Sequence, residues 1–129
     1  MIPVTTFFIG ILLLVQVPLG VRVSIYRGKH DIGLGDGGDA TLLKHMRAHG
    51  NFIEYVPIIL LGMAASELFG MEAFWLWIAG ALLVAARIVH ALSIYDIGGA
   101  VARGFGAGTT YLLMAIFGVY LAGHSIGIF

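Results

Sequence analysis

The sequence predicts an all-α integral membrane protein, a bundle of four transmembrane helices. Hydrophobic residues make up 60% of the 129 residues and charged residues only 11%, and the mean hydropathy is +0.99. Such values are typical of integral membrane proteins. A transmembrane helix needs about 20 apolar residues, and the chain has four such segments with short connections. We therefore expect residues 1–129 to form a single transmembrane domain.

The first expected helix covers about residues 3–26, has no acidic residue and has Arg22 as its only base. Residues 27–39 follow as a polar, glycine-rich connection. Its glycines match the spacing G-x-G-x-x-G, but no strand precedes them, so a flexible loop is favoured over a nucleotide site. The motif consists of Gly33, Gly35 and Gly38.

The second expected helix covers about residues 41–69, with Asp39 or Thr41 as its N-terminal cap. On a helix, residues spaced i, i+4 and i+7 lie on one face. Three polar residues of this segment have this spacing, and Lys44 lies one turn before the first of them. Small or apolar residues continue the same face after the last of them. The polar three are Arg47, Asn51 and Glu54, and the apolar continuation is Ile58, Leu61, Gly62 and Ala65.

The third expected helix covers about residues 73–95 and begins with Trp75 and Trp77, as an interfacial anchor would. Towards its other end, Arg87 and His90 are spaced i, i+3 and share one face.

The fourth expected helix covers about residues 101–123 and begins near Arg103. Gly104 and Gly108 within it form a pair of small residues that permits close helix approach.

Cations flank the first and third connections, whereas the second connection and both termini have no lysine or arginine. The positive-inside rule therefore predicts that both termini are on the non-cytoplasmic side. This topology brings the polar residues into one band near the cytoplasmic face. The band comprises Lys44, Arg47, Asn51, Glu54, Arg87, His90 and Arg103.

Each of these residues has a structural interpretation beside a functional one. Glu54 either neutralises Arg87 between helices or contacts a ligand, and the two roles are compatible because intramembrane ionisable groups are usually paired and functional. Arg47 is alternatively an anchor that extends towards the headgroups, and Asn51 either bridges helices or binds a polar ligand. His90 fits a packing role as well as a site role.

Other classes of site find less support. His45 and His49 have a metal-chelating spacing but lie opposite Arg47 and Glu54 without a third ligand, so no metal site is predicted. Cysteine is absent, so any thiol must come with a ligand, and no basic run indicates nucleic-acid binding.

These residues together resemble the MAPEG superfamily, the membrane-associated proteins in eicosanoid and glutathione metabolism. The string Arg47-Ala-His-x-Asn51-x-x-Glu54, with Pro57, is followed by Arg87-x-x-His90 and then by Arg103. The Gly35-Asp-Gly-Gly38 loop and the string around Asn51 look closest to an uncharacterised bacterial inner-membrane branch.

The resemblance implies a homotrimer of four-helix subunits that binds glutathione between neighbouring subunits. When the family's site residues are carried over by position, the resemblance implies that Arg103 is the catalytic residue and approaches the thiol of glutathione. The residues implied to hold glutathione or line its cleft are Lys44, Arg47, Asn51, Glu54, Arg87 and His90. Where prostaglandin-forming members have an arginine, a tyrosine and a serine, this chain has Gly50, Ile94 and Gly104, so prostaglandin or leukotriene synthesis is not carried over.

The function expected from this resemblance is a glutathione transferase or peroxidase that acts on lipophilic electrophiles dissolved in the membrane. One alternative is a non-enzymatic scaffold of the same fold that binds lipid or another ligand. Another is a proton-coupled exporter, but such small transporters typically have an essential carboxylate in the first helix, which here has none.

Overall fold

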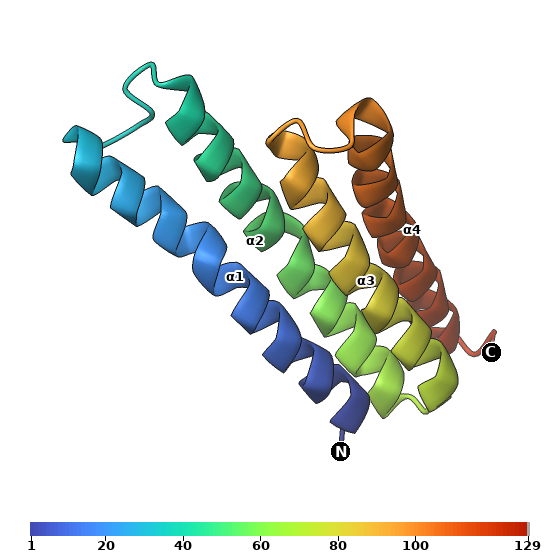
Figure 1. Cartoon of the computed structure of the whole chain (residues 1–129). Coiled ribbons are helices and arrows are strands. Elements are labelled where there is room, and N and C mark those ends of the chain that lie inside the picture. The colour runs from blue at the N-terminus through green and yellow to red at the C-terminus, as the bar shows by residue number, and fades with distance from the viewer. Residues whose placement is uncertain (129) are drawn as a thin grey trace.

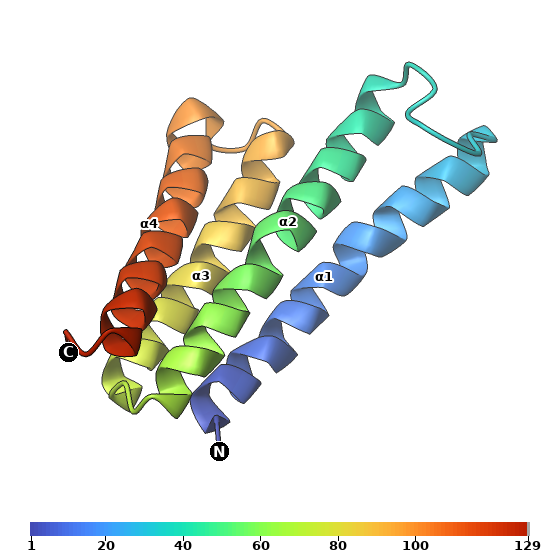
Figure 2. The same ribbon diagram turned by 180° about the vertical axis from the view of Figure 1, so that it is seen from behind.

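The computed structural model describes residues 1–128 and contains four α-helices there, with no strand in that part of the chain. Each helix is long and apolar enough to cross a membrane, which confirms the predicted fold class. The helices are α1 (Pro3–His30), α2 (Ala40–Leu68), α3 (Ala73–Ile94) and α4 (Gly99–Ser125). They run side by side, and both ends of the chain lie at the same end of the bundle (Figures 1 and 2).

The central pair of helices is α2 and α3, and each of the outer helices packs against both of them. Between α1 and α4 no contact is formed within residues 1–128. The core between the helices is apolar and includes Leu12, Phe52, Met63, Leu83 and Phe117. The faces of α1 and α4 that point away from the central pair therefore remain open.

The first helix is one turn longer than the sequence predicted, because α1 continues through Arg27, Lys29 and His30. Cations in a last turn interact favourably with the negative end of the helix dipole. Asp31 ends the helix in the left-handed conformation, with φ of 54°. The expected loop of residues 27–39 is therefore shortened to residues 31–39.

Glycine allows close approach of helices at two places inside the bundle. A Cβ atom on Gly80 of α3 would overlap the ring of Phe8 in α1. A Cβ atom on Gly106 of α4 would lie 2.6 Å from His90 Cβ in α3. The close approach that the sequence assigned to Gly104 and Gly108 is therefore made by Gly106, since the other two glycines face open space.

Asp39 caps α2, because its carboxylate accepts hydrogen bonds from the backbone N–H groups of Thr41 at 2.8 Å and Leu42 at 2.9 Å. The Tyr26 hydroxyl donates to the same carboxylate. The hydrogen bond from Leu42, with further contributions from Tyr26 and Thr41, holds the pKa of Asp39 below its ordinary value of 3.8.

We expect this cap to make stability fall in acid. A carboxyl group whose folded pKa is lowered stabilises the fold above its unfolded pKa of about 3.9, and the stabilisation is lost as pH falls through the folded value. Asp39→Asn keeps a capping side chain but removes the titration. The difference in melting temperature between the two proteins, followed by circular dichroism in detergent, should therefore shrink as pH falls below about 4. A difference that is the same at every pH would contradict this role.

Candidate functional site

Arg87 lies on α3 at the junction with α2 and α4. It is the centre of the band of polar residues described above, which we call the polar cluster. Its side chain is only 2% exposed. Nη1 donates a hydrogen bond to Asn51 Oδ1 at 3.1 Å, and Nη2 donates to the carbonyl oxygen of Gly106 at 2.8 Å and to the hydroxyl of Thr110. The Nε group is buried and has no partner. Arg87 therefore links three helices through neutral groups only.

Glu54 is not the counter-ion of Arg87 within the described chain, contrary to one of the roles expected from the sequence. Its side chain is exposed, and the one ion pair among residues 1–128 joins Lys44 to Asp96. The helical period put Glu54 on the same broad face as Asn51, but it could not show which of the two turns towards α3. Asn51 does so, and Glu54 remains on the open side.

Arg47 is also exposed and forms no ion pair within the described residues. It lies one helical turn before Asn51, so a cation and a carboxylate flank the amide that binds Arg87. In hydrocarbon or at its border, such unpaired charges are costly and usually mark a binding site or an interface.

Lys44 binds Asp96, a residue of the connection between α3 and α4. The hydrogen bond and the positive charge of Lys44 hold the pKa of the Asp96 carboxyl below its ordinary value. Both side chains are exposed, so the pair adds little to stability. Lys44 is therefore held at the end of the bundle by Asp96 and does not point along the line of Asn51 and Glu54.

Arg103 is exposed at the start of α4, and its Nη2 donates a hydrogen bond at 3.2 Å to the carbonyl oxygen of Ser93. Ser93 lies in the last turn of α3, whose free carbonyl groups attract cations. The contact orients the guanidinium along the α3–α4 boundary and leaves its other N–H groups available to a ligand.

His90 is 8% exposed and packs its Cβ against the backbone of Gly106. Its ring forms no hydrogen bond within residues 1–128. The geometry thus gives His90 a packing contact between α3 and α4, one turn from Arg87 and in the same cluster.

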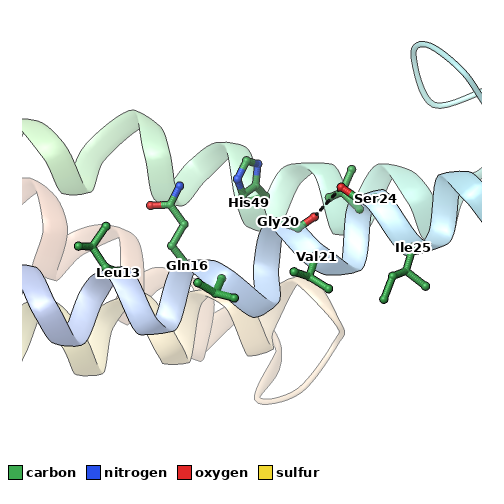
Figure 3. A pocket seen from close by; sticks show the side chains of 9 residues that line it. Leu13, Gln16, Gly20, Val21, Ser24, Ile25 and His49 are labelled. Atoms are coloured by element: carbon green, nitrogen blue, oxygen red, sulfur yellow. Dashed lines mark hydrogen bonds between the residues drawn. The ribbon is translucent and has the colours of Figure 1, made fainter.

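The two histidines considered as metal ligands have different neighbours. His45 Nδ1 forms a 2.8 Å hydrogen bond with the hydroxyl of Tyr95. His49 lies against Gly20 in a cavity of about 680 Å³ along α1 and α2, which also includes Gln16 (Figure 3). Among the described residues no group of three or more metal-ligating side chains comes together.

An apolar groove between α2 and α4 continues from the polar cluster. Its volume is about 350 Å³, and α2 contributes Ile58, Leu61 and Gly62, the residues that the sequence placed after Glu54 on the same face. The opposite wall belongs to α4 and includes Met114, Phe117 and Leu121. A charged region and an apolar groove thus follow one another along α2.

Two residues that contribute to the cluster, Thr110 and Tyr111, were not among the site residues predicted from the sequence. Thr110 accepts a hydrogen bond from Arg87 and donates one to the Gly106 carbonyl at 2.7 Å. Its spacing of seven residues from Arg103 would have placed it on the same face of α4. The hydroxyl of Tyr111 lies 3.3 Å from that of Tyr55 beside the cluster.

Comparison with known proteins agrees with this architecture. The sequence model of the MAPEG family matches residues 5–123. The inner membrane protein YecN of Escherichia coli strain K12 is 38% identical over 64 residues, and so is the protein of the same name from the O6:H1 strain CFT073. The match covers 50% of this chain and 49% of each relative. No solved structure matches the sequence.

Proposed function

The chain belongs to the MAPEG family, and from this premise we propose that it is a glutathione-binding integral protein of the inner membrane. The relative from Escherichia coli is named as an inner membrane protein, and four helices here can cross a membrane. We further propose that the protein is a glutathione transferase or peroxidase that acts on lipophilic electrophiles.

The observation that carries the proposal is the buried, unneutralised charge of Arg87. A buried cation is costly unless it is paired, and here its hydrogen-bond partners are neutral. With Arg47 and Arg103, the cluster has three guanidinium groups against the single carboxylate of Glu54. Glutathione has two carboxylates and one ammonium group, so it complements this excess of positive charge while also offering a partner to Glu54.

The chemistry would use the thiol of glutathione, since the protein has no cysteine. A free thiol has a pKa of about 8.5, and a nearby guanidinium in a poorly solvated site favours the thiolate. Arg103 is the residue proposed for this role. The thiolate would attack an electrophilic carbon, forming a carbon–sulfur bond while the leaving group departs with its electron pair. The groove between α2 and α4, which begins one helical turn after Glu54, offers apolar space for such a substrate.

A homotrimer is part of the proposal, with the site completed by a neighbouring subunit. Arg47 and Glu54 are exposed on the open side of α2, where lipid alone would leave both charges poorly solvated. A second copy of the chain on this side would cover the charges while leaving an entrance for glutathione.

We expect different substitutions to affect the binding of glutathione and the chemical step. Arg103→Ala should lower kcat, because a contact with the thiolate is lost, whereas Asn51→Ala should mainly raise the KM for glutathione through lost ground-state contacts. Conjugation of a lipophilic aromatic electrophile provides the rate, and the ultraviolet absorbance of the thiolate at neutral pH reports its formation. Each change should be about tenfold or more, because a hydrogen bond to a charged group contributes about 1.5–3 kcal/mol.

Arg103→Lys and Lys29→Gln are the controls. The first keeps a positive charge and should recover part of the rate, and the second removes a cation of α1 that is remote from the cluster. Equal effects of Arg103→Ala and Asn51→Ala on both constants would contradict the division of roles. Protein that binds a lipophilic ligand but gives no thiolate absorbance would instead support the non-enzymatic scaffold.

A further inference from the structure

A second groove lies between α1 and α3, away from the Arg87 cluster. Its volume is about 460 Å³, within the range of small-molecule sites. Apolar side chains form nearly all of its walls, and Arg22 and Tyr95 lie at one end. The apolar lining comes from Ile11, Leu14, Val15, Pro18 and Leu19 of α1 and from Ile88, Ala91 and Leu92 of α3.

Arg22 is exposed and has no carboxylate partner among residues 1–128. Its guanidinium carbon lies 5.5 Å from the centre of the Tyr95 ring, a distance at which the ring attracts the cation. Tyr95 is fixed in turn by the hydrogen bond between its hydroxyl and His45. Stacking on the ring orients the guanidinium and leaves its N–H edge free for an anion.

The dimensions of the groove match one leaflet of a bilayer. Ile11 and Arg22 mark its extent along α1, and eleven residues at 1.5 Å per residue span about 16 Å. Half of the hydrocarbon layer is about 15 Å thick. A lipid with its headgroup at Arg22 would therefore extend its acyl chain to the region of Ile11 without crossing into the other leaflet.

We propose that the α1–α3 groove binds an anionic phospholipid, with its phosphate on Arg22 and an acyl chain along Leu14 and Pro18. Basic pockets between transmembrane helices bind anionic headgroups in this way. The described lining of the grooves on the α1–α2 and α2–α4 sides contains no arginine or lysine. The positive charge of Arg22 therefore distinguishes the α1–α3 groove from the other grooves as the site for an anionic lipid.

The site is independent of the proposed glutathione chemistry. Its residues come from α1 and α3, and none of them contacts Arg87 through a hydrogen bond. Two other cations at this end of the bundle are already engaged: Arg27 donates to the carbonyl oxygens of Ile32 and Gly33, and Lys44 binds Asp96.

Native mass spectrometry of the delipidated protein in mild detergent tests the proposal, with added phosphatidylglycerol and phosphatidylcholine of identical acyl chains. The wild type should retain the anionic lipid in preference to the zwitterionic one. Arg22→Gln should weaken phosphatidylglycerol binding about fivefold or more, the effect of one basic contact at a membrane surface. Arg22→Lys should keep part of the affinity, since it retains the charge without the planar edge.

Two further variants test whether lipid is retained in the groove itself, rather than by the charge of the protein surface, and whether a loss of retention comes from misfolding. Leu14 is 70% exposed, so Leu14→Trp fills the groove without disturbing the core and should reduce lipid retention with every charge in place. Lys29→Gln removes a cation of α1 outside the groove and should have little effect. Equal retention of both lipids would overturn the proposal. So would unchanged binding in Arg22→Gln or Leu14→Trp, or a loss in Lys29→Gln as large as that in Arg22→Gln.

Discussion

Replacing Arg87 by methionine is expected to leave the fold intact and to weaken glutathione binding about a hundredfold or more. Methionine fills a similar volume without charge, so the cost of burying the guanidinium disappears. The Gly106 carbonyl and the Thr110 hydroxyl lose Arg87 as a donor but keep their hydrogen bond to each other, so among the described residues only the half-buried Asn51 oxygen is left without a donor. Loss of a buried charge from a ligand contact typically costs about 2–5 kcal/mol of binding energy.

Isothermal titration with glutathione measures the affinity, and thermal unfolding without glutathione measures the stability. Arg47→Met is the matched control, because it removes the same charge from an exposed position and should cause a smaller loss of affinity. Wild-type affinity in Arg87→Met would show that the guanidinium does not contact the ligand. A protein that fails to fold would show that the charge serves the structure.

Gly106→Ala is expected to destabilise the α3–α4 pair by about 1–3 kcal/mol, the usual cost of adding a methyl group to a tightly packed contact. The new Cβ atom would lie 2.6 Å from His90 Cβ and 2.9 Å from the Ala86 carbonyl oxygen. One of these obstacles is backbone, which cannot move aside without displacing the helix. Because Gly106 also accepts a hydrogen bond from Arg87, glutathione binding should weaken in parallel.

Gly108→Ala is the control for this substitution, two residues further along the same helix. No atom lies within 4 Å of the Cβ position there, and alanine is favoured over glycine in a helix by about 1 kcal/mol. The melting temperature should therefore fall for Gly106→Ala and stay level or rise for Gly108→Ala. The same change in both variants would contradict the close approach at Gly106.

The four helices could be predicted from the sequence because long apolar runs separated by short polar connections leave few alternatives. The helical period also placed Arg47, Asn51 and Glu54 on one face, and Asn51 does contact Arg87. The bounds differ most at the end of α1, where the added turn depends on the interaction of cations with the helix end and on the left-handed Asp31.

Contacts between helices could not be predicted because the period does not give the rotation of each helix about its axis. It did not show that Gly106, between Gly104 and Gly108, would meet His90. The helical period likewise left open whether Glu54 would contact Arg87. The groups that contact Arg87 instead include Thr110 and the backbone carbonyl of Gly106. A polar residue such as Thr110 gives little signal until the packing partner is known.

Native mass spectrometry with glutathione is the most direct test of the central claim, because it reports subunit number and ligand together. We expect a homotrimer in mild detergent that takes up as many as three glutathione molecules, with uptake lost in Arg87→Met while the trimer persists. A monomer or dimer that binds glutathione would contradict the inter-subunit site, and a trimer that binds none at millimolar concentration would contradict the glutathione function itself.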